Sequence, residues 1–265
     1  MEGFSSRTVL MLGEDGYGRL SAARVAVFGI GGVGGYAVEA LARAGVGELV
    51  LVDSDRVTES NINRQIIATV ETVGKYKTEA AKERILSINP DCRVEVHNLF
   101  FGEECAHLFD FSKFDYIIDA IDSVKQKVAL IRCATEAGTK IISAMGAGNK
   151  LDPTRFRVAD ISKTTVCPLA KAVRTSLRKL GINHLKVVFS DEPPCGSLTE
   201  GEAPSEQSRI PSGLAPNQSP DEPPLTKEHS GYVARRSPGS ISFVPSVMGL
   251  ILAGEVIKDI AGINA

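Results

Sequence analysis

The spacing of apolar residues changes repeatedly between two patterns over residues 24–144. Short runs of consecutive apolar residues, which are typical of strands buried on both faces, alternate with stretches whose apolar side chains recur at every third or fourth position, as in helices. This alternation predicts an α/β fold of the Rossmann-like, doubly wound kind, with a mostly parallel sheet and helices on both faces. The predicted strands are 24–30, 48–53, 93–98, 115–120 and 140–144, and the predicted helices between them include 33–44 and 77–88.

The pattern changes again in the C-terminal half. Spacing predicts a helix over 169–180, and the stretch 191–239 then holds nine of the thirteen prolines and few large apolar residues. A stretch of this composition cannot bury enough surface to offset its loss of conformational entropy, so we expect a long flexible loop. A short strand at 241–244 and an apolar helix at 246–260 are predicted to follow. That helix is long enough to pack on the sheet or on a partner subunit.

Composition sets broad limits on function. The chain has 265 residues, of which 43% are hydrophobic, so it can bury a sizeable core, and we divide it into a sheet domain, 1–150, and a C-terminal extension, 151–265. The net charge of -2 argues against a uniformly basic nucleic-acid-binding protein. No apolar run reaches the roughly 20 residues of a membrane span. Residues 1–7 lack the apolar core of a signal peptide, so we expect a cytoplasmic protein.

The cysteines do not form a recognisable metal or disulfide framework. No cysteine lies within three residues of another, so there is no C-x-x-C pair and we expect no structural zinc. Most are expected to fill the core as small apolar residues, whereas Cys167 and Cys195 lie near candidate chemistry or in the proline-rich stretch. The five are Cys92, Cys105, Cys133, Cys167 and Cys195.

Positive charge is concentrated in 150–190. This region has nine lysines and arginines against two aspartates, a local net charge of about +7. Lys171, Arg174 and Arg178 are spaced to lie roughly on one face of the helix predicted there. Two interpretations remain open, namely an ordinary solvated helix face and a surface that contacts nucleic-acid phosphates.

A glycine-rich segment, G-x-G-G-x-G, follows the first predicted strand. Glycines at this point let the backbone approach a phosphate, and the N-terminus of the next helix attracts the anion. Asp53 ends the next predicted strand, where a carboxylate can hold ribose hydroxyls. Alone, these features indicate a nucleotide and would favour a nicotinamide or flavin enzyme, with glycines needed only for tight packing as the alternative. The glycines are Gly29, Gly31, Gly32 and Gly34.

The residues after Asp53 do not fit a hydride-transfer enzyme. Cleavage of ATP between its α and β phosphates places negative charge on the leaving pyrophosphate, which fixed arginine and lysine side chains oppose. Asp122 follows the strand predicted at 115–120, where it can hold a magnesium ion. Each residue alone could be a surface charge or a helix cap, but their order favours ATP. The set is Asp53, Asp55, Asn61, Arg64, Gln65, Lys77 and Asp122.

Four motifs therefore occur in order: G-x-G-G-x-G, D-x-D-x-V-x-x-S-N-x-x-R-Q, V-G-x-x-K and D-x-x-D. Together they resemble the adenylating domain of the ubiquitin-activating superfamily, whose members transfer AMP from ATP to a carboxylate. The resemblance implies that Asp53 binds ribose and that Asn61, Arg64 and Lys77 surround the phosphates. It further implies that Asp122 coordinates Mg²⁺ and that Arg7 is donated across the interface of a homodimer.

The C-terminal half of the chain indicates which branch of the superfamily this sequence resembles. Members that activate sulfur-carrier proteins usually have two C-x-x-C zinc pairs there, and this chain has none. Instead, 143–171 and 185–194 closely resemble the tRNA threonylcarbamoyladenosine dehydratases, and the resemblance covers about 1–194 and 238–262. It implies that ATP adenylates the carboxylate of the modified adenosine in tRNA, after which the modification's own carbamoyl group closes a ring and expels AMP. Such an intramolecular attack needs no enzyme nucleophile, so Cys167 is not required.

Three alternatives stay open at this point. The first is an adenylyltransferase that activates the C-terminal carboxylate of a ubiquitin-like sulfur-carrier protein. The second is a hydride-transfer enzyme, and the third is a nucleotide-binding scaffold without activity, against which the intact Arg64, Lys77 and Asp122 argue. The resemblance also leaves open an association with a cysteine desulfurase or another sulfur-acceptor protein.

Overall fold

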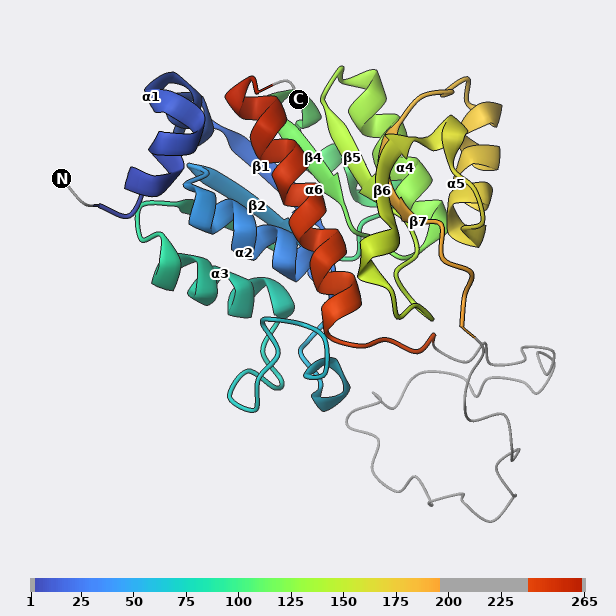
Figure 1. The fold of residues 1–265 in the computed structure, drawn as a ribbon, viewed down its shortest axis with the longest axis horizontal. Coiled ribbons are helices and arrows are strands. Elements are labelled where there is room, and N and C mark those ends of the chain that lie inside the picture. Colours follow the sequence, from blue (N-terminus) through green and yellow to red (C-terminus); the bar gives the residue numbers. More distant parts are fainter. Residues whose placement is uncertain (1–2, 196–237, 264–265) are drawn as a thin grey trace, which may run out of the picture.

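One sheet of seven strands organises the computed structural model, which describes residues 3–195 and 238–263 (Figure 1). The strand order is β3-β2-β1-β4-β5-β7-β6, and neighbouring strands are parallel except for the antiparallel pair β6 and β7. The chain winds outward from β1 in one direction and then from β4 in the other, as in dinucleotide-binding folds. The strands are β1 (Arg24–Phe28), β2 (Glu48–Val52), β3 (Arg93–His97), β4 (Tyr116–Asp119), β5 (Ile141–Ala144), β6 (Phe156–Asp160) and β7 (Lys186–Ser190).

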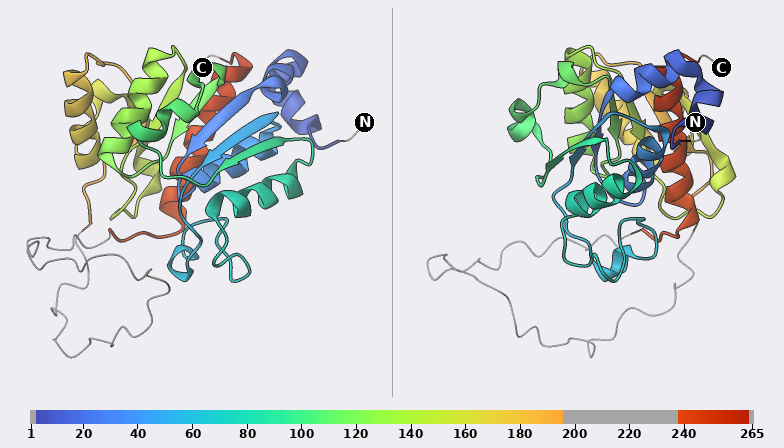
Figure 2. Two further views of the ribbon diagram at one scale, coloured as in Figure 1. Left: turned by 180° about the vertical axis from the view of Figure 1, so that it is seen from behind. Right: turned by 90° about the vertical axis from the view of Figure 1, so that its left-hand side faces the viewer.

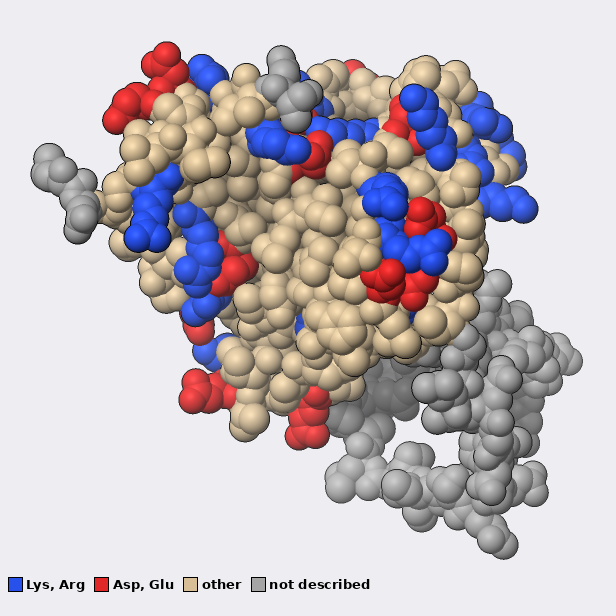
Figure 3. Space-filling model, viewed as in Figure 1, with Lys and Arg blue, Asp and Glu red and all other residues tan. Residues whose placement is uncertain are grey.

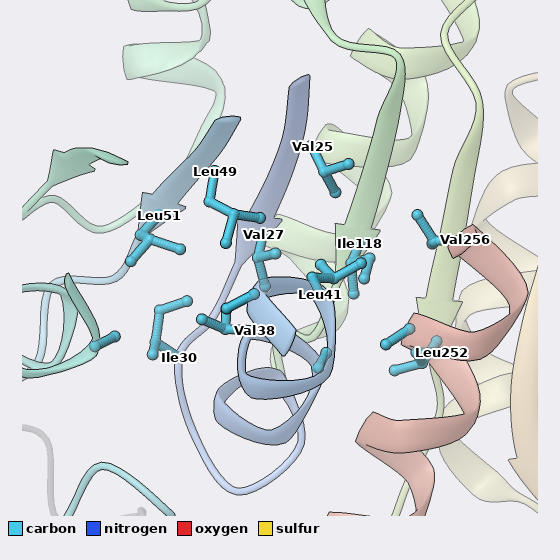
Figure 4. Packing of buried hydrophobic residues seen from close by; sticks show 14 of the residues in the cluster. Val25, Val27, Ile30, Val38, Leu41, Leu49, Leu51, Ile118, Leu252 and Val256 are labelled. Atoms are coloured by element: carbon cyan, nitrogen blue, oxygen red, sulfur yellow. The ribbon is translucent and has the colours of Figure 1, made fainter. Parts of the chain in front are cut away.

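Helices cover both faces because successive side chains of each central strand point to opposite sides and both sides are apolar. Val25 and Val27 face α2 and α6, whereas Ala26 and Phe28 face the other layer. Figure 4 shows Leu41 of α2 and other α2 and α6 side chains packed on the first of these faces. The helices are α1 (Ser6–Ala22), α2 (Gly34–Ala44), α3 (Lys77–Ile88), α4 (Val124–Glu136), α5 (Pro168–Lys179) and α6 (Phe243–Ala261).

The C-terminal helix α6 packs on its own sheet. Its buried side chains, including Met248 and Leu252, join the same core as α2. Gly249 allows the two helices to approach closely, since a Cβ atom there would lie 2.3 Å from the carbonyl oxygen of Val33. The choice that the sequence left open, between the sheet and a partner subunit, is therefore settled for these buried residues in favour of the sheet.

The hydrophobic core on the opposite face of the sheet has two parts. Figure 2 shows the molecule from that side in its left view. The connection from β3 to β4 contributes an aromatic cluster, in which Phe101, Phe109 and Phe111 pack around Phe28. Phe114 packs on Phe111, and residues of α4 join the same cluster. Farther along the sheet, α5 packs over β7 through its own apolar stripe. The short 3-10 turns in the connections are η1 (Glu59–Asn61), η2 (Glu103–Leu108), η3 (Phe111–Lys113), η4 (Pro153–Arg155) and η5 (Ile161–Lys163).

The strands and helices predicted between 24 and 144 are confirmed, with bounds that differ by up to two residues. The strand predicted at 241–244 is wrong, because α6 begins at Phe243. Pro245 explains the difference, since proline fits the first turn of a helix but has no N–H to donate to a strand ladder. Two helices, α1 and α4, and two strands, β6 and β7, had not been predicted.

The C-terminal extension contributes to the same sheet as the N-terminal part, because β6 and β7 extend it beyond β5. A domain boundary at residue 150 stays a prediction. Of the proline-rich stretch, 196–237 lies outside the described residues. Within the described ranges, no helix has both the length and the apolar character needed to cross a membrane.

Candidate functional site

A pocket of about 650 Å³ opens at the carboxyl ends of the central strands. It lies where the chain direction changes between β1 and β4, which is where open α/β sheets bind ligands. Every charged or amide residue predicted for the site, except Arg7, lines this pocket. The predicted residues that line it are Gly29, Gly31, Gly32, Asp53, Asp55, Asn61, Arg64, Gln65, Lys77 and Asp122.

The glycines of the loop after β1 serve two purposes. Some are required by the backbone of the turn, and one leaves space for a ligand. Gly29 has a φ of +89°, and a Cβ atom on Gly34 would lie 1.8 Å from the carbonyl oxygen of Gly29, so both positions need glycine for the turn itself. Gly31 is different, because a Cβ atom there would meet only Gln65 Nε2, at 4.0 Å. Glycine at position 31 therefore leaves space in the pocket, at the N-terminus of α2, where a phosphate is favoured.

Asp53 holds the glycine loop from the end of β2. Its carboxylate accepts hydrogen bonds from the backbone N–H of Ile30 at 2.6 Å and of Asp55 at 2.8 Å. Burial raises the pKa of Asp53 above its ordinary value, against the opposing effects of Lys77 and of these two N–H groups. Further donors, such as ribose hydroxyls, would stabilise this partly desolvated carboxylate.

Lys77 is the first residue of α3 and is almost fully buried. Its Nζ lies 2.7 Å from Oδ2 of Asp55, whose side chain is mostly exposed. The ammonium group therefore has a weakly shielded partner and faces the pocket, where additional anionic oxygens can approach it.

The segment around η1 presents three more predicted residues. Asn61 is buried and its Oδ1 accepts from the N–H of Thr58, which closes the turn. Arg64 Nη1 donates to the carbonyl of Ser60 and to Oδ1 of Asn63, both at 2.8 Å. Gln65 is buried too, but no donor among the described residues reaches its Oε1. An unpaired buried polar atom in a pocket indicates that a ligand or water completes it.

Asp122 lies three residues beyond the buried end of β4. Its side chain is exposed, lines the pocket and forms no salt bridge with any described residue. The described residues contain no group of three or more potential metal-ligating side chains. A magnesium ion bound with a nucleotide needs only one or two carboxylates besides the phosphates, so Asp122 suits that use.

The sequence analysis missed a fully buried ion pair, Asp119 with Lys127, close to Asp122 in the chain. Lys127 Nζ lies 2.9 Å from Oδ2 of Asp119, which also accepts from Ser143 Oγ at 2.5 Å. Oδ1 of Asp119 accepts from the N–H of Ile121 at 3.1 Å and so fixes the loop that carries Asp122. The signal was available, because an aspartate ending a buried strand requires a partner and a lysine follows eight residues later.

A model of the ThiF family matches residues 5–265, nearly the whole chain. The chain belongs to the ThiF family. It is 43% identical over 256 residues to the tRNA threonylcarbamoyladenosine dehydratase of Bacillus subtilis, covering 96% of this chain and 93% of that protein.

A solved structure of a similar protein agrees with the fold. The crystal structure of the Escherichia coli tRNA N6-threonylcarbamoyladenosine dehydratase in complex with ATP has a TM-score of 0.78 and 30% identity, and covers 97% of this chain and 93% of that one. The Mycobacterium tuberculosis protein named probable adenylyltransferase/sulfurtransferase MoeZ is 41% identical, but over only 127 residues, 48% of this chain and 32% of that protein.

Beside this ThiF-family pocket lies helix α5, whose first turn contributes Leu169 to the lining. Lys171 and Arg178 are exposed and form no salt bridge within the described ranges, whereas Arg174 Nη1 donates to the carbonyls of Ile161 and Thr164, both at 3.1 Å. Figure 3 shows lysine and arginine side chains gathered where Figure 1 draws α5.

The basic character of 150–190 is smaller than its composition indicates. Arg155 pairs with Asp191 at 2.7 Å, and Lys186 pairs with Glu255 at 2.7 Å. Buried Lys150 donates to the carbonyl of Glu192 at 2.5 Å. These three residues stabilise the fold through contacts within the chain. The positive charge that stays exposed is therefore concentrated on α5.

Two further predicted residues lie away from the pocket lining. Arg7 is exposed on α1 and does not line the pocket of its own chain. Cys167 is buried at the N-cap of α5, where its Sγ accepts from the N–H of Ala170 at 3.5 Å. That position gives Cys167 a place in starting the helix.

Proposed function

We propose that this protein is an ATP-dependent tRNA threonylcarbamoyladenosine dehydratase, which closes the threonylcarbamoyl group into a ring. The observation that carries the proposal is the near full-length match to the Bacillus subtilis protein of that name. The pocket supports it, because its charges are placed for a nucleoside triphosphate rather than for a nicotinamide.

The nucleotide lies across the glycine loop in this proposal. Asp53 accepts hydrogen bonds from the ribose, and the backbone around Gly31 approaches the phosphates. Asn61 adds polar contacts at the same end, as does Gln65 Oε1, which no donor in 3–195 or 238–263 reaches. The Escherichia coli relative solved with ATP supports this assignment of the ligand.

Arg64 and Lys77 are the proposed catalytic cations. A carboxylate oxygen of the substrate attacks the α-phosphorus, the bond to the bridging oxygen breaks, and pyrophosphate leaves. Both side chains line the pocket and oppose the charge that develops on the phosphates. Mg²⁺ would be held by Asp122 together with phosphate oxygens, where it neutralises the same charge.

The other half of the pocket suits an uncharged group. Its lining beyond β5 consists, in the described residues, of Met145, Gly146, Ala147, Gly148 and Leu169 with Pro238 and Ser240 opposite. Once the carboxylate is adenylated, the remaining part of the modification is uncharged. Its carbamoyl group attacks the activated carbonyl carbon, AMP leaves, and the net change is the loss of one water.

The tRNA is held, in this proposal, by Lys171, Arg174 and Arg178 on α5. Lys171 is two residues from Leu169, which lines the pocket, and Arg178 lies about 10 Å farther along the helix. A row of cations leading away from the pocket suits a polyanion whose modified base enters the site. A substrate of this kind also favours a cytoplasmic protein.

A homodimer completes the proposed arrangement. Leu10 and Met11 of α1 are 85% and 80% exposed, and the surface over α6 has few charges (Figure 3). Apolar surface of this kind suits a second copy of the chain, which would bring Arg7 toward the partner's pocket. Sedimentation should then give the mass of two chains, and substitution of both Leu10 and Met11 by aspartate should halve it.

The decisive test incubates the protein with ATP, Mg²⁺ and tRNA that carries threonylcarbamoyladenosine, followed by mass spectrometry of the nucleosides. A nucleoside lighter by one water, formed together with AMP and pyrophosphate, is expected. The same tRNA without the modification is the control and should release no AMP.

An unchanged nucleoside would overturn the proposal. If AMP then appeared only when a ubiquitin-like sulfur carrier ending in Gly-Gly was added, the protein would be an adenylyltransferase for such carriers. The match to the MoeZ protein, which covers about half of this chain, does not favour that second function over the first.

A further inference from the structure

Residues 238–240, here called the pocket strap, form part of the wall of the pocket. They lie opposite residues 145–149, which follow β5 and are here called the β5 loop. Pro238 and Ser240 line the pocket, as does Gly148 across from them. The approach is close, because a Cβ atom on Gly148 would lie 2.8 Å from Cβ of Pro238. The strap must therefore keep its position if the uncharged half of the pocket is to keep its shape.

Asn149 holds one end of the pocket strap. Its N–H donates to the carbonyl of Gly239 at 2.8 Å, and its Oδ1 accepts from the N–H of Gly239 at 2.6 Å. Its own carbonyl accepts from the N–H of Cys195 at 2.7 Å. One residue thus binds the chain on both sides of 196–237 to the loop that lines the pocket.

The backbone of Asn149 is adapted to this role. Its φ is +56°, in the left-handed region that asparagine tolerates better than most other residues. This conformation presents the N–H and the side-chain oxygen together to Gly239. Asparagine therefore supplies both an unusual backbone angle and a hydrogen-bond acceptor at the same position.

Asn63 holds the other end of the pocket strap. Its Nδ2 donates to the carbonyl of Ser240 at 3.0 Å, while its Oδ1 accepts from Arg64 Nη1 at 2.8 Å. The orientation of the amide is fixed, because a donor lies on one side and an acceptor on the other. The strap therefore connects the β5 loop to the guanidinium group that we place at the phosphates.

We propose that Asn149 is a positioning residue, which holds the pocket strap so that the substrate carboxylate meets the α-phosphate beside Arg64. The inference rests on the proposed function, since it names where that substrate is oriented. Displacement of reacting atoms by about 1 Å can cost two orders of magnitude in rate, so a wall fixed at both ends has a direct use.

Two variants of Asn149 separate positioning from general stability. Asn149→Gly keeps the left-handed backbone but removes the acceptor for Gly239, whereas Asn149→Asp keeps an acceptor oxygen and tolerates the same φ. Asn183→Gly is the matched control, because Asn183 is exposed in the α5–β7 connection, at the amino ends of the strands.

With modified tRNA and saturating ATP, Asn149→Gly should lower kcat/KM for tRNA by at least about fivefold, the effect of one lost hydrogen bond. The affinity for ATP alone should stay the same, and Asn149→Asp and Asn183→Gly should behave like the wild type. Wild-type kinetics in Asn149→Gly, or an equal loss in Asn149→Asp, would overturn the proposal.

Hydrogen exchange of the full-length protein gives a readout that does not depend on activity. The amide of Gly239 should exchange faster in Asn149→Gly than in the wild type, with protection restored in Asn149→Asp. Equal protection in all three proteins would overturn the proposal. If the wild type left modified tRNA unchanged, the proposed function would fail by itself, and this exchange measurement would still decide whether Asn149 holds the strap.

Discussion

Charged residues are frequent at both ends of the strands, here called the amino edge and the carboxyl edge of the sheet after the ends of the parallel strands that meet there. The charges at these two ends have different uses. At the amino edge, Lys186 pairs with Asp259 at 3.0 Å and Tyr116 Oη donates to the same carboxylate at 2.7 Å. At the carboxyl edge, Asp122 has no salt bridge with any described residue, and Gln65 Oε1 lacks a donor there. The amino edge binds helix α6 to the sheet, whereas the carboxyl edge keeps polar groups available for a ligand.

This difference shows why a count of charges along the sequence is a poor guide to function. Lys186 and Lys171 belong to the same basic stretch, yet Lys186 is bound to two acidic residues of α6 and Lys171 is exposed. Pairing in space, rather than density in sequence, separates a structural charge from one that can bind a substrate. Variants at the two edges should therefore fail in different ways.

The largest expected effect is on catalysis at the carboxyl edge. Lys77→Ala or Asp122→Ala should reduce the rate of tRNA dehydration by about 10²–10³. Lys77 opposes the charge on the phosphates directly, and Asp122 would hold the Mg²⁺ that does so. The melting temperature of Asp122→Ala should stay that of the wild type, because the side chain is exposed and without a salt bridge to described residues.

Lys186→Ala is the counterpart at the amino edge. It should lower the melting temperature but leave the rate per folded molecule unchanged, as measured by rapid assays below the melting transition. A catalytic loss in Lys186→Ala as large as that in Asp122→Ala would contradict the proposed division between the edges.

A smaller effect is expected from two glycines of the same loop. Gly31→Ala should fold normally, since its Cβ meets open space, but should bind ATP about tenfold more weakly because the backbone can no longer approach the phosphate. Gly34→Ala should lose stability as well, because its Cβ would overlap the carbonyl oxygen of Gly29. Calorimetric titration with ATP and thermal melting would distinguish them, and equal affinities for Gly31→Ala and wild type would place the phosphates elsewhere.

The sequence predicted the central part of the fold because apolar runs and helical spacing are local signals. It predicted the site because the motifs follow strands, and the carboxyl ends of parallel strands meet at one edge. It did not predict β6, whose exposed edge position leaves Arg157 and Val158 without a buried pattern. Helix α1 was missed for a related reason, since Gly13 interrupts its helical backbone at a φ of +72°.

The missing parts of the site depend on contacts between distant residues. Asn149 contacts Gly239 from 90 positions away, and Asn63 contacts Ser240 from 177 positions away. No spacing rule connects such positions, because the fold must first bring them together. The first two residues of α6, Phe243 and Val244, were assigned to a strand at 241–244 because four apolar or small residues are too few to show a period.

A still smaller effect is expected on the binding of tRNA by α5. Lys171→Ala and Arg178→Ala should each weaken tRNA binding several-fold and reduce the slope of log affinity against log salt by about one. Arg174→Ala should also lower the melting temperature, since Nη1 holds the carbonyls of Ile161 and Thr164. Filter binding at several salt concentrations would measure the slope, and an unchanged slope in Lys171→Ala would place the RNA on another surface.

The smallest effect is on the pH dependence of stability, where the two edges should have opposite signs. Burial raises the pKa of Asp259, but hydrogen bonds from Tyr116 and Lys186 outweigh it and hold that pKa below its ordinary value of 3.8. Its stabilising contribution is therefore present above the unfolded pKa and is lost as the pH falls through the folded pKa. For Asp53, burial raises the pKa above 3.8, so its contribution is present below the unfolded pKa and is lost as the pH rises through the folded pKa.

Urea unfolding between about pH 3 and pH 6 would measure these opposite slopes. Asp259→Asn should make the free energy of unfolding rise less steeply with pH than in the wild type, because a carboxylate stabilised by folding is gone. Asp53→Asn should make it rise more steeply, because the carboxyl group whose ionisation opposes folding is gone. If both variants changed the slope in the same direction, the two edges would not differ in how they hold their charges, and the assignment of Asp53 to a desolvated, ligand-facing position would be wrong.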